Sequence, residues 1–273
     1  MTKAREESVR ALAVEQDHVT LATFSAITDV ADGQLALTPI AGLVEHERMS
    51  KDEEELGTLR RAAAISDAAF EGVTRAVSPG MTERELAVAL EESMRRSGAD
   101  GPAFPTIVAA GANGAEPHHQ PTDYAIASGD LVTVDMGARV HGYHSDMTRT
   151  FAVGRLEDWQ QAIYAVVDAA QRAGCAAVVA GAAAGSVDVA ARSVIEAAGY
   201  GDNFVHGVGH GVGLQIHESP MLFGKSDVTL ADGMVVTVEP GIYLPGRGGV
   251  RIEDTLIVAG SAPEVINRAA RGL

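Results

Sequence analysis

Two periods of hydrophobic and polar residues alternate along this chain and predict helices followed by strands. From residue 51 to about residue 77, apolar residues recur at helical spacing after an acidic start, which predicts a long amphipathic helix. The segment SPGM at residues 78–81 ends this helix, and Thr82 with Glu85 forms a capping-box pattern for a second helix that ends near Gly98. Runs that predict strands then cover residues 104–111, 131–140 and 146–153.

The second half of the chain repeats this order of elements. The pattern predicts a long helix over residues 157–180, a break at Gly185 and Ser186, and a shorter helix over residues 187–198. Strands are again predicted after the helices, over residues 213–218, 234–244 and 249–258.

Two six-residue segments at corresponding places in these halves are nearly identical, VTVDMG at 132–137 and VTVEPG at 236–241. They align without a gap, and the helix break at Gly80 aligns with Gly185 at almost the same offset. Agreement in both order and offset predicts an internal duplication. Since two repeats are too few for a solenoid, we expect a pseudo-twofold domain whose equivalent strands face a shared cleft.

The repeated strands carry acidic residues at equivalent positions. Side chains two residues apart share one face of a strand, so Thr133 and Asp135 should point one way while the valines beside them pack inward. The same spacing holds for Thr237 and Glu239, and each strand turns into a partner that carries another acid. The acids expected on one side of the sheet are Asp135, Asp146, Glu239 and Glu253.

A shared cluster of these acids requires cations. One such acid alone is better explained as a solvated surface charge, but the flanking runs are too apolar for an outer face. Two carboxylates 4 Å apart repel by about 4 kcal/mol at an effective dielectric constant of about 20. The segment HGVGHGVGLQIHESP at 206–220 adds His206, His210 and His217. A phosphate-binding glycine loop is disfavoured there because a strand, and no helix, is predicted to follow.

Charge and ligand type favour a centre of two metal ions. Four carboxylates and one neutral imidazole carry a charge that two divalent cations would balance. Oxygen-rich ligation with one histidine suits Mn²⁺, Co²⁺, Fe²⁺ or Zn²⁺. A water that bridges two such ions would be acidic enough to act as hydroxide near neutral pH.

Composition narrows the class of protein and its partners. The 273 residues are 46% hydrophobic, enough for a substantial core, and the net charge of −16 argues against nucleic acid and anionic membranes as partners. The single cysteine, Cys175, excludes an intrachain disulfide and favours a reducing compartment. The first residues lack a signal-peptide pattern, and the apolar stretch around 173–184 is too short to span a bilayer. We therefore expect a cytoplasmic location.

Four ordered motifs resemble those of the pita-bread metallopeptidases (M24), in particular the Xaa-Pro branch of aminopeptidase P and prolidase. They are FPTIVAAGANGAEPHH, GDLVTVDMGARVHGYHSDMTRTFAVG, HGVGHGVGLQIHESP and EPGIYLPGRGGVRIEDTLIV. The resemblance covers roughly residues 45–262. It implies an α+β pita-bread fold, with a curved antiparallel sheet and helices on its outer face. Residues 1–48 would be a short remnant of an amino-terminal creatinase-type domain, and residues 49–273 the catalytic domain.

The resemblance also implies the metal ligands. Asp135 would chelate one ion, Asp146 and Glu253 would bridge both ions, and His210 and Glu239 would complete the second site. Mn²⁺ or Co²⁺ would be the usual ions, with Zn²⁺ or Fe²⁺ as alternatives.

Further residues take family roles around this centre. In the implied mechanism a bridging hydroxide attacks the scissile carbonyl, and Glu239 passes the proton toward the leaving nitrogen. His118 and His217 would donate to the carbonyl oxygen or the substrate backbone, and His206 would line the proline side. Arg251, with Tyr243, would bind or orient the substrate. His118 is preferred over His119, which would be a polar loop residue, because its spacing to Asp135 fits the Xaa-Pro pattern.

The function implied is an Xaa-Pro aminopeptidase that hydrolyses the bond before proline in small peptides, with a homodimer left open. Arg251 favours this branch, because the methionine aminopeptidases are expected to have glutamine there.

The alternative is an Xaa-Pro dipeptidase, which needs a cation for the free carboxylate. Lys225 is the only basic residue in ESPMLFGKSDVTL, and Met221 stands where some prolidases have arginine. A methionine-aminopeptidase-like enzyme, a creatinase-like hydrolase or lyase and a non-catalytic binding module are less favoured.

Overall fold

The computed structural model describes residues 9–271, and its elements follow the predicted order. The described helices are α2 (Leu21–Ala31), α3 (Leu43–Met49), α4 (Glu53–Thr74), α5 (Glu83–Arg96), α6 (Asp158–Ala177) and α7 (Ala184–Ala197), with the short 3-10 helices η1 (Gly111–Ala115) and η2 (Gly201–Asn203). The described strands are β1 (Ala11–Glu15), β2 (Ala36–Ile40), β3 (Gly101–Pro102), β4 (Ile107–Ala110), β5 (Asp130–Met136), β6 (Ala138–Val140), β7 (Tyr143–His144), β8 (Met147–Val153), β9 (Gly209–Gly211), β10 (Glu218–Leu222), β11 (Val235–Val238), β12 (Gly241–Leu244), β13 (Gly248–Arg251), β14 (Asp254–Ile257) and β15 (Glu264–Val265). The signal-peptide expectation depends partly on residues 1–8, which lie outside the described part.

The chain forms two compact units, Met1–Glu47 and Arg48–Leu273. In the first unit β1 and β2 pair in parallel, and α2 connects them. The hydroxyl of Thr20 caps α2 by accepting a hydrogen bond from the Thr23 amide at 3.1 Å. Residues 11–40 therefore form a strand–helix–strand unit. The interpretation of residues 1–48 as a domain remnant stays a prediction.

The first half of the second unit packs α4 and α5 against the antiparallel sheet β4-β5-β8. Thr82 and Glu85 form the predicted capping box at the start of α5. Leu86 of α5 and both valines of β5, Val132 and Val134, are completely buried in the core of this half. The inward-facing valines of the repeated segment are therefore where alternation predicts them.

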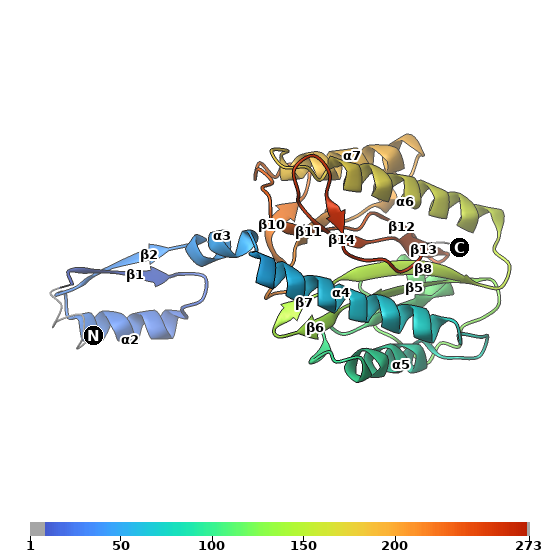
Figure 1. Ribbon diagram of the computed structural model, residues 1–273, viewed down its shortest axis with the longest axis horizontal. Coiled ribbons are helices and arrows are strands. Elements are labelled where there is room, and N and C mark those ends of the chain that lie inside the picture. Colours follow the sequence, from blue (N-terminus) through green and yellow to red (C-terminus); the bar gives the residue numbers. More distant parts are fainter. Residues whose placement is uncertain (1–8, 272–273) are drawn as a thin grey trace. The chain divides into compact units, whose positions relative to one another are not determined.

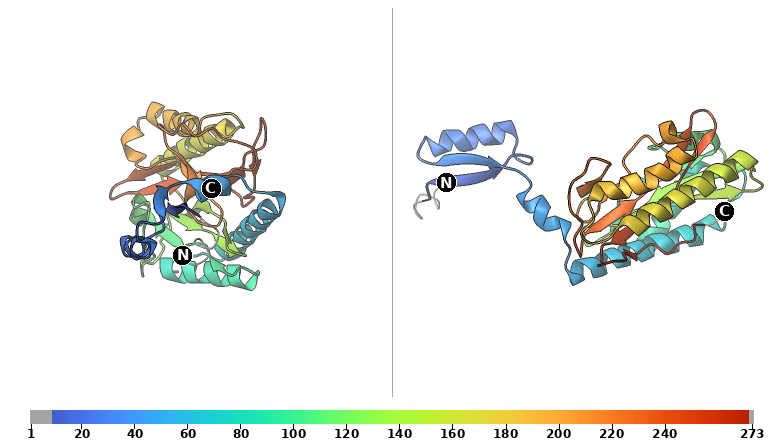
Figure 2. Two further views of the ribbon diagram at one scale, coloured as in Figure 1. Left: turned by 90° about the vertical axis from the view of Figure 1, so that its left-hand side faces the viewer. Right: turned by 90° about the horizontal axis from the view of Figure 1, so that it is seen from above.

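The second half packs α6 and α7 against a sheet of order β10-β9-β11-β14-β15, with β12 and β13 as a separate pair. Val236 and Val238 of β11 are fully buried in its core, as Val132 and Val134 are in the first half. Figure 1 shows α6 and α7 on one side of the strands and α4 and α5 on the other. The same layering is visible from two further directions in Figure 2. The predicted arrangement of strands covered by outer helices is confirmed.

The predicted helix break at Gly185 and Ser186 is wrong. Both residues lie in the first turn of α7, and the interruption lies between Val178 and Ala183. Gly185 is needed inside the helix because an added Cβ would lie 2.7 Å from the Ser226 carbonyl oxygen. Local sequence shows the glycine but not the backbone that approaches it.

The structural counterpart of Gly80 is consequently Gly181 and not Gly185. Both glycines have positive φ, and each amide donates to the equivalent carbonyl, Gly80 to Ile126 at 2.9 Å and Gly181 to Leu230 at 2.8 Å. The duplication is thus visible in hydrogen bonding as well as in element order. The number of residues between equivalent positions of the two halves differs, however, between these glycines and the repeated strands.

The strand predicted over residues 213–218 is also misplaced. Residues 213–217 form a loop, and β10 begins only at Glu218. Within the described residues no helix is long and apolar enough to cross a membrane.

Candidate metal centre

Four carboxylates from both halves converge on one cavity of about 370 Å³. Each comes from the end of a strand or from a residue between strands. Asp135 is the next-to-last residue of β5, Asp146 precedes β8, Glu239 follows β11, and Glu253 lies between β13 and β14. Since β5 and β11 are the repeated strands, the internal duplication brings the acids together.

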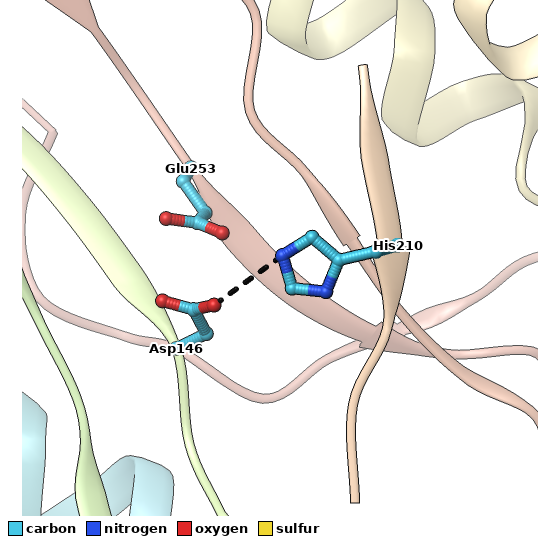
Figure 3. Close-up of side chains that lie close together, drawn as sticks. All are labelled: Asp146, His210 and Glu253. Carbon is cyan, nitrogen blue, oxygen red and sulfur yellow. Dashed lines mark ion pairs between the residues drawn. The ribbon is translucent and has the colours of Figure 1, made fainter. Parts of the chain in front are cut away.

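His210 lies among these carboxylates in a defined tautomer. Its Nδ1 lies 3.0 Å from the Gly211 carbonyl oxygen, which can only accept, so Nδ1 carries the proton. In the neutral ring the lone pair is then on Nε2, which lies 3.3 Å from Glu239 and 3.6 Å from Asp146. Ligand atoms of Asp146, His210 and Glu253 all lie within 4.8 Å of one another. Figure 3 shows the three side chains pointing toward one another. Acceptors that face one another in this way require a proton or a metal ion between them.

Two further observations fit a cation in this cluster. Within the described residues, Asp135 Oδ1 and Glu253 Oε1 are buried and have no hydrogen-bond partner. Unsatisfied carboxylate oxygens are costly in a buried site unless a cation contacts them. The donor set of carboxylates and one imidazole suits a divalent ion of the Mn²⁺, Co²⁺, Fe²⁺ or Zn²⁺ type.

The pKa values in this cluster report the same excess of negative charge. Burial, followed by the neighbouring carboxylates, raises the pKa of Asp146 and Glu253 well above the usual range. Burial also raises the pKa of Asp135, although Arg251 opposes it. Burial acts to raise the pKa of Glu239 too, but the hydrogen bond from a protonated His210, with the charges of His210, His206 and Arg251, lowers it below its usual value. Cations would take the place of the protons that this cluster otherwise holds.

Arg251 is held at the cavity wall by contacts along its whole guanidinium group. Its Nη2 lies 2.7 Å from Asp135, its Nε lies 3.1 Å from the Thr148 hydroxyl, and its Nη1 donates to the Pro117 carbonyl at 3.1 Å and the Tyr243 hydroxyl at 3.0 Å. All three nitrogens are therefore engaged, so the group is rigidly oriented.

Tyr243 lies behind the cavity, in contrast to the substrate-contacting position expected for it. It is buried and is not among the residues that line the cavity. Its hydroxyl lies 2.8 Å from His206 Nε2, while His206 Nδ1 donates to the Gly207 carbonyl at 2.8 Å. The tyrosine hydroxyl thus donates to His206 and accepts from Arg251, which holds both side chains in place.

The other predicted histidines separate into two environments. His118, His206 and His217 line the cavity, and the His217 ring packs edge-on against His210 with centroids 4.4 Å apart. His119 is buried away from the cavity, where its Nε2 lies 2.9 Å from Glu83. His119 is a polar loop residue, as expected, but it is also part of a buried hydrogen-bond network.

Sequence reasoning missed residues that complete the site. The Thr148 hydroxyl donates to Glu253 at 2.7 Å and accepts from Arg251. Its position two residues after Asp146 is the signal that could have identified it, because alternate residues of a strand share a face. Apolar walls of the cavity come from Phe104, Ile107, Ile216, Met221, Leu222 and Phe223. These residues have no local pattern that distinguishes them from core positions.

Comparisons with known proteins agree with this geometry. The metallopeptidase family M24 matches residues 57–259. The chain is 43% identical over 265 residues to an uncharacterized peptidase of Bacillus subtilis, covering 97% of this chain and 75% of that protein. It is 41% identical over 234 residues to an Xaa-Pro dipeptidase of Pyrococcus furiosus, covering 86% and 67%.

Solved structures show the same relationship. An Xaa-Pro dipeptidase from Bacillus anthracis superposes with a TM-score of 0.96 at 42% identity, covering 100% of this chain and 77% of that one. An X-Pro aminopeptidase from Thermotoga maritima has a TM-score of 0.93 at 35% identity, covering 100% and 78%. The chain therefore belongs to metallopeptidase family M24, with the α+β pita-bread fold of that family.

Proposed function

We propose that this chain is a metal-dependent Xaa-Pro dipeptidase, a prolidase, which hydrolyses dipeptides with proline in second position. The observation that carries the proposal is the set of side chains on one cavity wall, where four carboxylates and His210 lie beside His118, His206, His217 and Arg251. A cavity of about 370 Å³ is at the small end of ligand sites, which suits a dipeptide. Relatives named as Xaa-Pro dipeptidases support this function over the aminopeptidase expected first.

The residues that would hold two divalent ions, of the Mn²⁺ or Co²⁺ type, are Asp135, Asp146, His210, Glu239 and Glu253. Such ions, when bound, act as Lewis acids and lower the pKa of water toward neutrality. The two carboxylate oxygens without hydrogen-bond donors, on Asp135 and Glu253, support their place in this set.

Glu239 is the residue we assign to proton transfer. It lines the cavity, its pKa lies below the usual value, and its carboxylate lies within 3.3 Å of both His210 Nε2 and the Thr237 hydroxyl. An ionised carboxylate in this place can accept a proton from the attacking water and deliver it to the leaving proline nitrogen.

The remaining polar side chains of the cavity would orient the substrate and stabilise charge. His118 and His217 are placed to donate to the carbonyl oxygen as it gains negative charge. His206, fixed by Tyr243, would line the proline side. Arg251 is fully engaged with protein groups, so it would orient Asp135 and the cavity wall more than bind substrate directly.

One observation favours an Xaa-Pro aminopeptidase as a second candidate. Among the described residues that line the cavity, Arg251 is the only lysine or arginine, and four hydrogen bonds to protein groups already engage all three of its nitrogens. The free carboxylate of a dipeptide would therefore meet imidazoles and the half-exposed Met221. A longer peptide without a carboxylate at this point would fit the apolar wall of Met221 and Phe223.

Hydrolysis of matched peptides separates these candidates. With Mn²⁺ or Co²⁺ added, we expect kcat/KM for Ala-Pro and Met-Pro to be at least about tenfold higher than for Ala-Pro-Ala. A preference for Ala-Pro-Ala would identify an aminopeptidase instead. Cleavage of Met-Ala without cleavage of any proline peptide would overturn the substrate class. Metal binding without any hydrolysis would point to a non-catalytic module.

A further inference from the structure

Glu83 is a completely buried carboxylate that lies outside the metal cluster. It is the first residue of α5, directly after the cap residue Thr82, and its exposed fraction is 0%. Its Oε1 accepts from the Ala110 amide at 2.8 Å and the Asn113 side chain at 3.0 Å. Its Oε2 lies 2.9 Å from His119 Nε2, and accepts from the Thr122 amide at 3.0 Å and hydroxyl at 2.7 Å. An ionised carboxylate has about four lone-pair sites, so this one is fully used.

All five donors belong to one stretch of chain, residues 110–122. This stretch leaves β4, passes through η1 and carries Pro117 and His118 to the cavity wall. The Pro117 carbonyl accepts from Arg251. The stretch is therefore attached at one side to Glu83 and at the other to Arg251, with His118 next to the second attachment.

The charge of Glu83 suits this arrangement. Burial alone would raise the pKa of this carboxyl, but the hydrogen bonds from Asn113, Thr122, Ala110 and His119 lower it below the usual value. The amino terminus of α5 also favours a negative charge in its first turn. Glu83 is thus a fixed anion around which the loop is organised, and it contacts none of the five candidate metal ligands.

We propose that Glu83 is a positioning residue for the active site, which gathers residues 110–122 on its buried carboxylate and thereby holds His118 at the cavity wall. The inference rests on the proposed function, because that function assigns His118 its task toward the substrate. A buried acid that only stabilised α5 would not need all its hydrogen-bond donors on a single loop that also lines the cavity.

Glu83→Gln tests this role in the full chain with Mn²⁺ bound. Glutamine keeps the shape, but its amide nitrogen would face two or three of the donors. We expect kcat/KM for Ala-Pro to fall about 10- to 100-fold, since supporting residues around metal sites have effects of this size. The matched control is Leu90→Ala, which removes a fully buried side chain from the same helix but none of the five hydrogen bonds of Glu83. An equal loss of activity in the control would overturn the proposal.

A double-mutant cycle with His118→Ala shows whether Glu83 acts through this histidine. If it does, the double variant should be within about twofold of His118→Ala alone. Losses that multiply would refute the coupling. Thr122→Val, which removes a single donor, gives a milder variant should Glu83→Gln fold poorly, and we expect it to lose about threefold in kcat/KM.

Hydrogen exchange tests whether Glu83 orders residues 110–122 without any measurement of activity. Without substrate, the amides of Ala110 and Thr122 should exchange at least about tenfold faster in Glu83→Gln, relative to amides of the α4 core. Unchanged exchange throughout 110–122 would contradict the proposal. Because this measurement needs no turnover, it remains decisive if the proposed dipeptidase function fails.

Discussion

Glu253 is almost completely buried, yet only one of its carboxylate oxygens has a donor in the described part of the chain, the Thr148 hydroxyl at 2.7 Å. Asp135 is in a similar position, with one oxygen paired to Arg251 and the other without a partner. Burying such groups lowers the stability of the metal-free protein, while the same groups bind cations strongly. The arrangement that would favour metal binding at these residues therefore lowers the stability of the metal-free protein.

Glu253→Gln should separate these two effects. We expect loss of bound metal and at least an approximately 100-fold loss of kcat, since this residue would be a direct ligand. The metal-free variant should be more stable than the metal-free wild type by about 1 kcal/mol, because like-charge repulsion is removed. Metal analysis and thermal unfolding after chelation measure both quantities. An exposed acid, Glu92, provides the control as Glu92→Gln; wild-type metal content in Glu253→Gln would contradict the assignment.

Glu239→Gln should affect turnover more than binding. Removing a group that transfers protons costs about 100- to 10,000-fold in kcat, whereas we expect KM to change by less than about threefold. Steady-state kinetics with saturating Mn²⁺ provide the measurement. An unchanged kcat would rule out proton transfer by Glu239.

Glu83 should make stability depend on pH. Its folded-state pKa lies below the usual value, while the unfolded-state pKa is about 4.3. Its contribution is therefore complete above about pH 4.3 and is lost as the pH falls through the folded-state pKa. Wild type should exceed Glu83→Gln by about 2 kcal/mol in free energy of unfolding at pH 6, and by less at about pH 3.5. Urea titrations at both pH values check this; a gap that stays constant would mean that folding does not lower the pKa of Glu83.

At the scale of elements, the three-residue strand β9 places His210 between β10 and β11. Gly209 and Gly211 flank the histidine because the neighbouring backbones leave no space for a side chain. An added Cβ would overlap the Thr237 carbonyl at Gly209 and the Ser219 carbonyl at Gly211. The alternating glycines of this motif are therefore explained by close strand packing around His210, a proposed metal ligand.

Gly209→Ala should consequently destabilise the protein by at least about 2 kcal/mol, because the backbone of β11 would have to move. Gly57→Ala is the matched control, since Gly57 lies in α4 with nothing within 4 Å of an added Cβ. That control should be stabilising by about 0.5–1 kcal/mol. Chemical unfolding of both variants gives the comparison, and equal stabilities would disprove the packing explanation.

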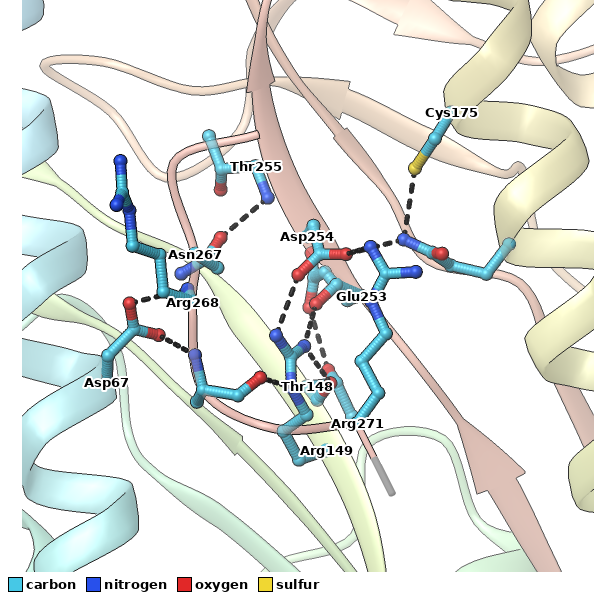
Figure 4. Close-up of polar contacts among 12 residues, drawn as sticks. Asp67, Thr148, Arg149, Cys175, Glu253, Asp254, Thr255, Asn267, Arg268 and Arg271 are labelled. Carbon is cyan, nitrogen blue, oxygen red and sulfur yellow. Dashed lines mark hydrogen bonds and ion pairs between the residues drawn. The ribbon is translucent and has the colours of Figure 1, made fainter. Parts of the chain in front are cut away.

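At the scale of the catalytic unit, a buried ion-pair network joins the two halves behind the metal cluster (Figure 4). Arg149 of β8 pairs with Asp254 of β14 at 2.7 Å, and both side chains are almost fully buried. Asp254 also accepts from Gln171 of α6 at 2.7 Å and from Arg271. The residues directly before Arg149 and Asp254 in the chain are Thr148 and Glu253, which hydrogen-bond to each other at the acidic cluster. The proposed ligands and this network therefore lie next to each other along the chain.

Asp254→Ala should therefore lower the free energy of unfolding by about 3–5 kcal/mol, because it leaves Arg149 buried without its counter-ion. The control is Asp168→Ala, which breaks an i,i+4 ion pair with Arg172 on the surface of α6. It should lower the free energy of unfolding by less than about 0.5 kcal/mol. Thermal and urea unfolding of the two variants check the difference. A small effect of Asp254→Ala would indicate that other contacts between the halves are sufficient.

Element types and the acidic cluster could be predicted from local pattern and from the repeat. Alternation places Val132 and Val134 in the core and Asp135 on the opposite face, and the duplication adds Glu239 at the equivalent place. Gly185 does not end a helix, because glycine ends some helices and in others makes room for a neighbouring backbone. Residues 213–217 form a loop and not the predicted strand, since short apolar runs do not distinguish a strand from a loop.

The periodicity, the repeat and the spacing of the acids and histidines can be recognised in the amino-acid order alone, and they indicate the fold class and the kind of centre. Three features depend on the folded chain: Tyr243 lies behind the cavity, Thr148 joins Glu253 to Arg251, and Glu83 gathers residues 110–122. The difference arises because local patterns contain no information on contacts between distant residues. Periodicity reports which face of an element a residue occupies, whereas a hydrogen bond between Glu83 and Thr122 depends on how the chain returns after 39 residues.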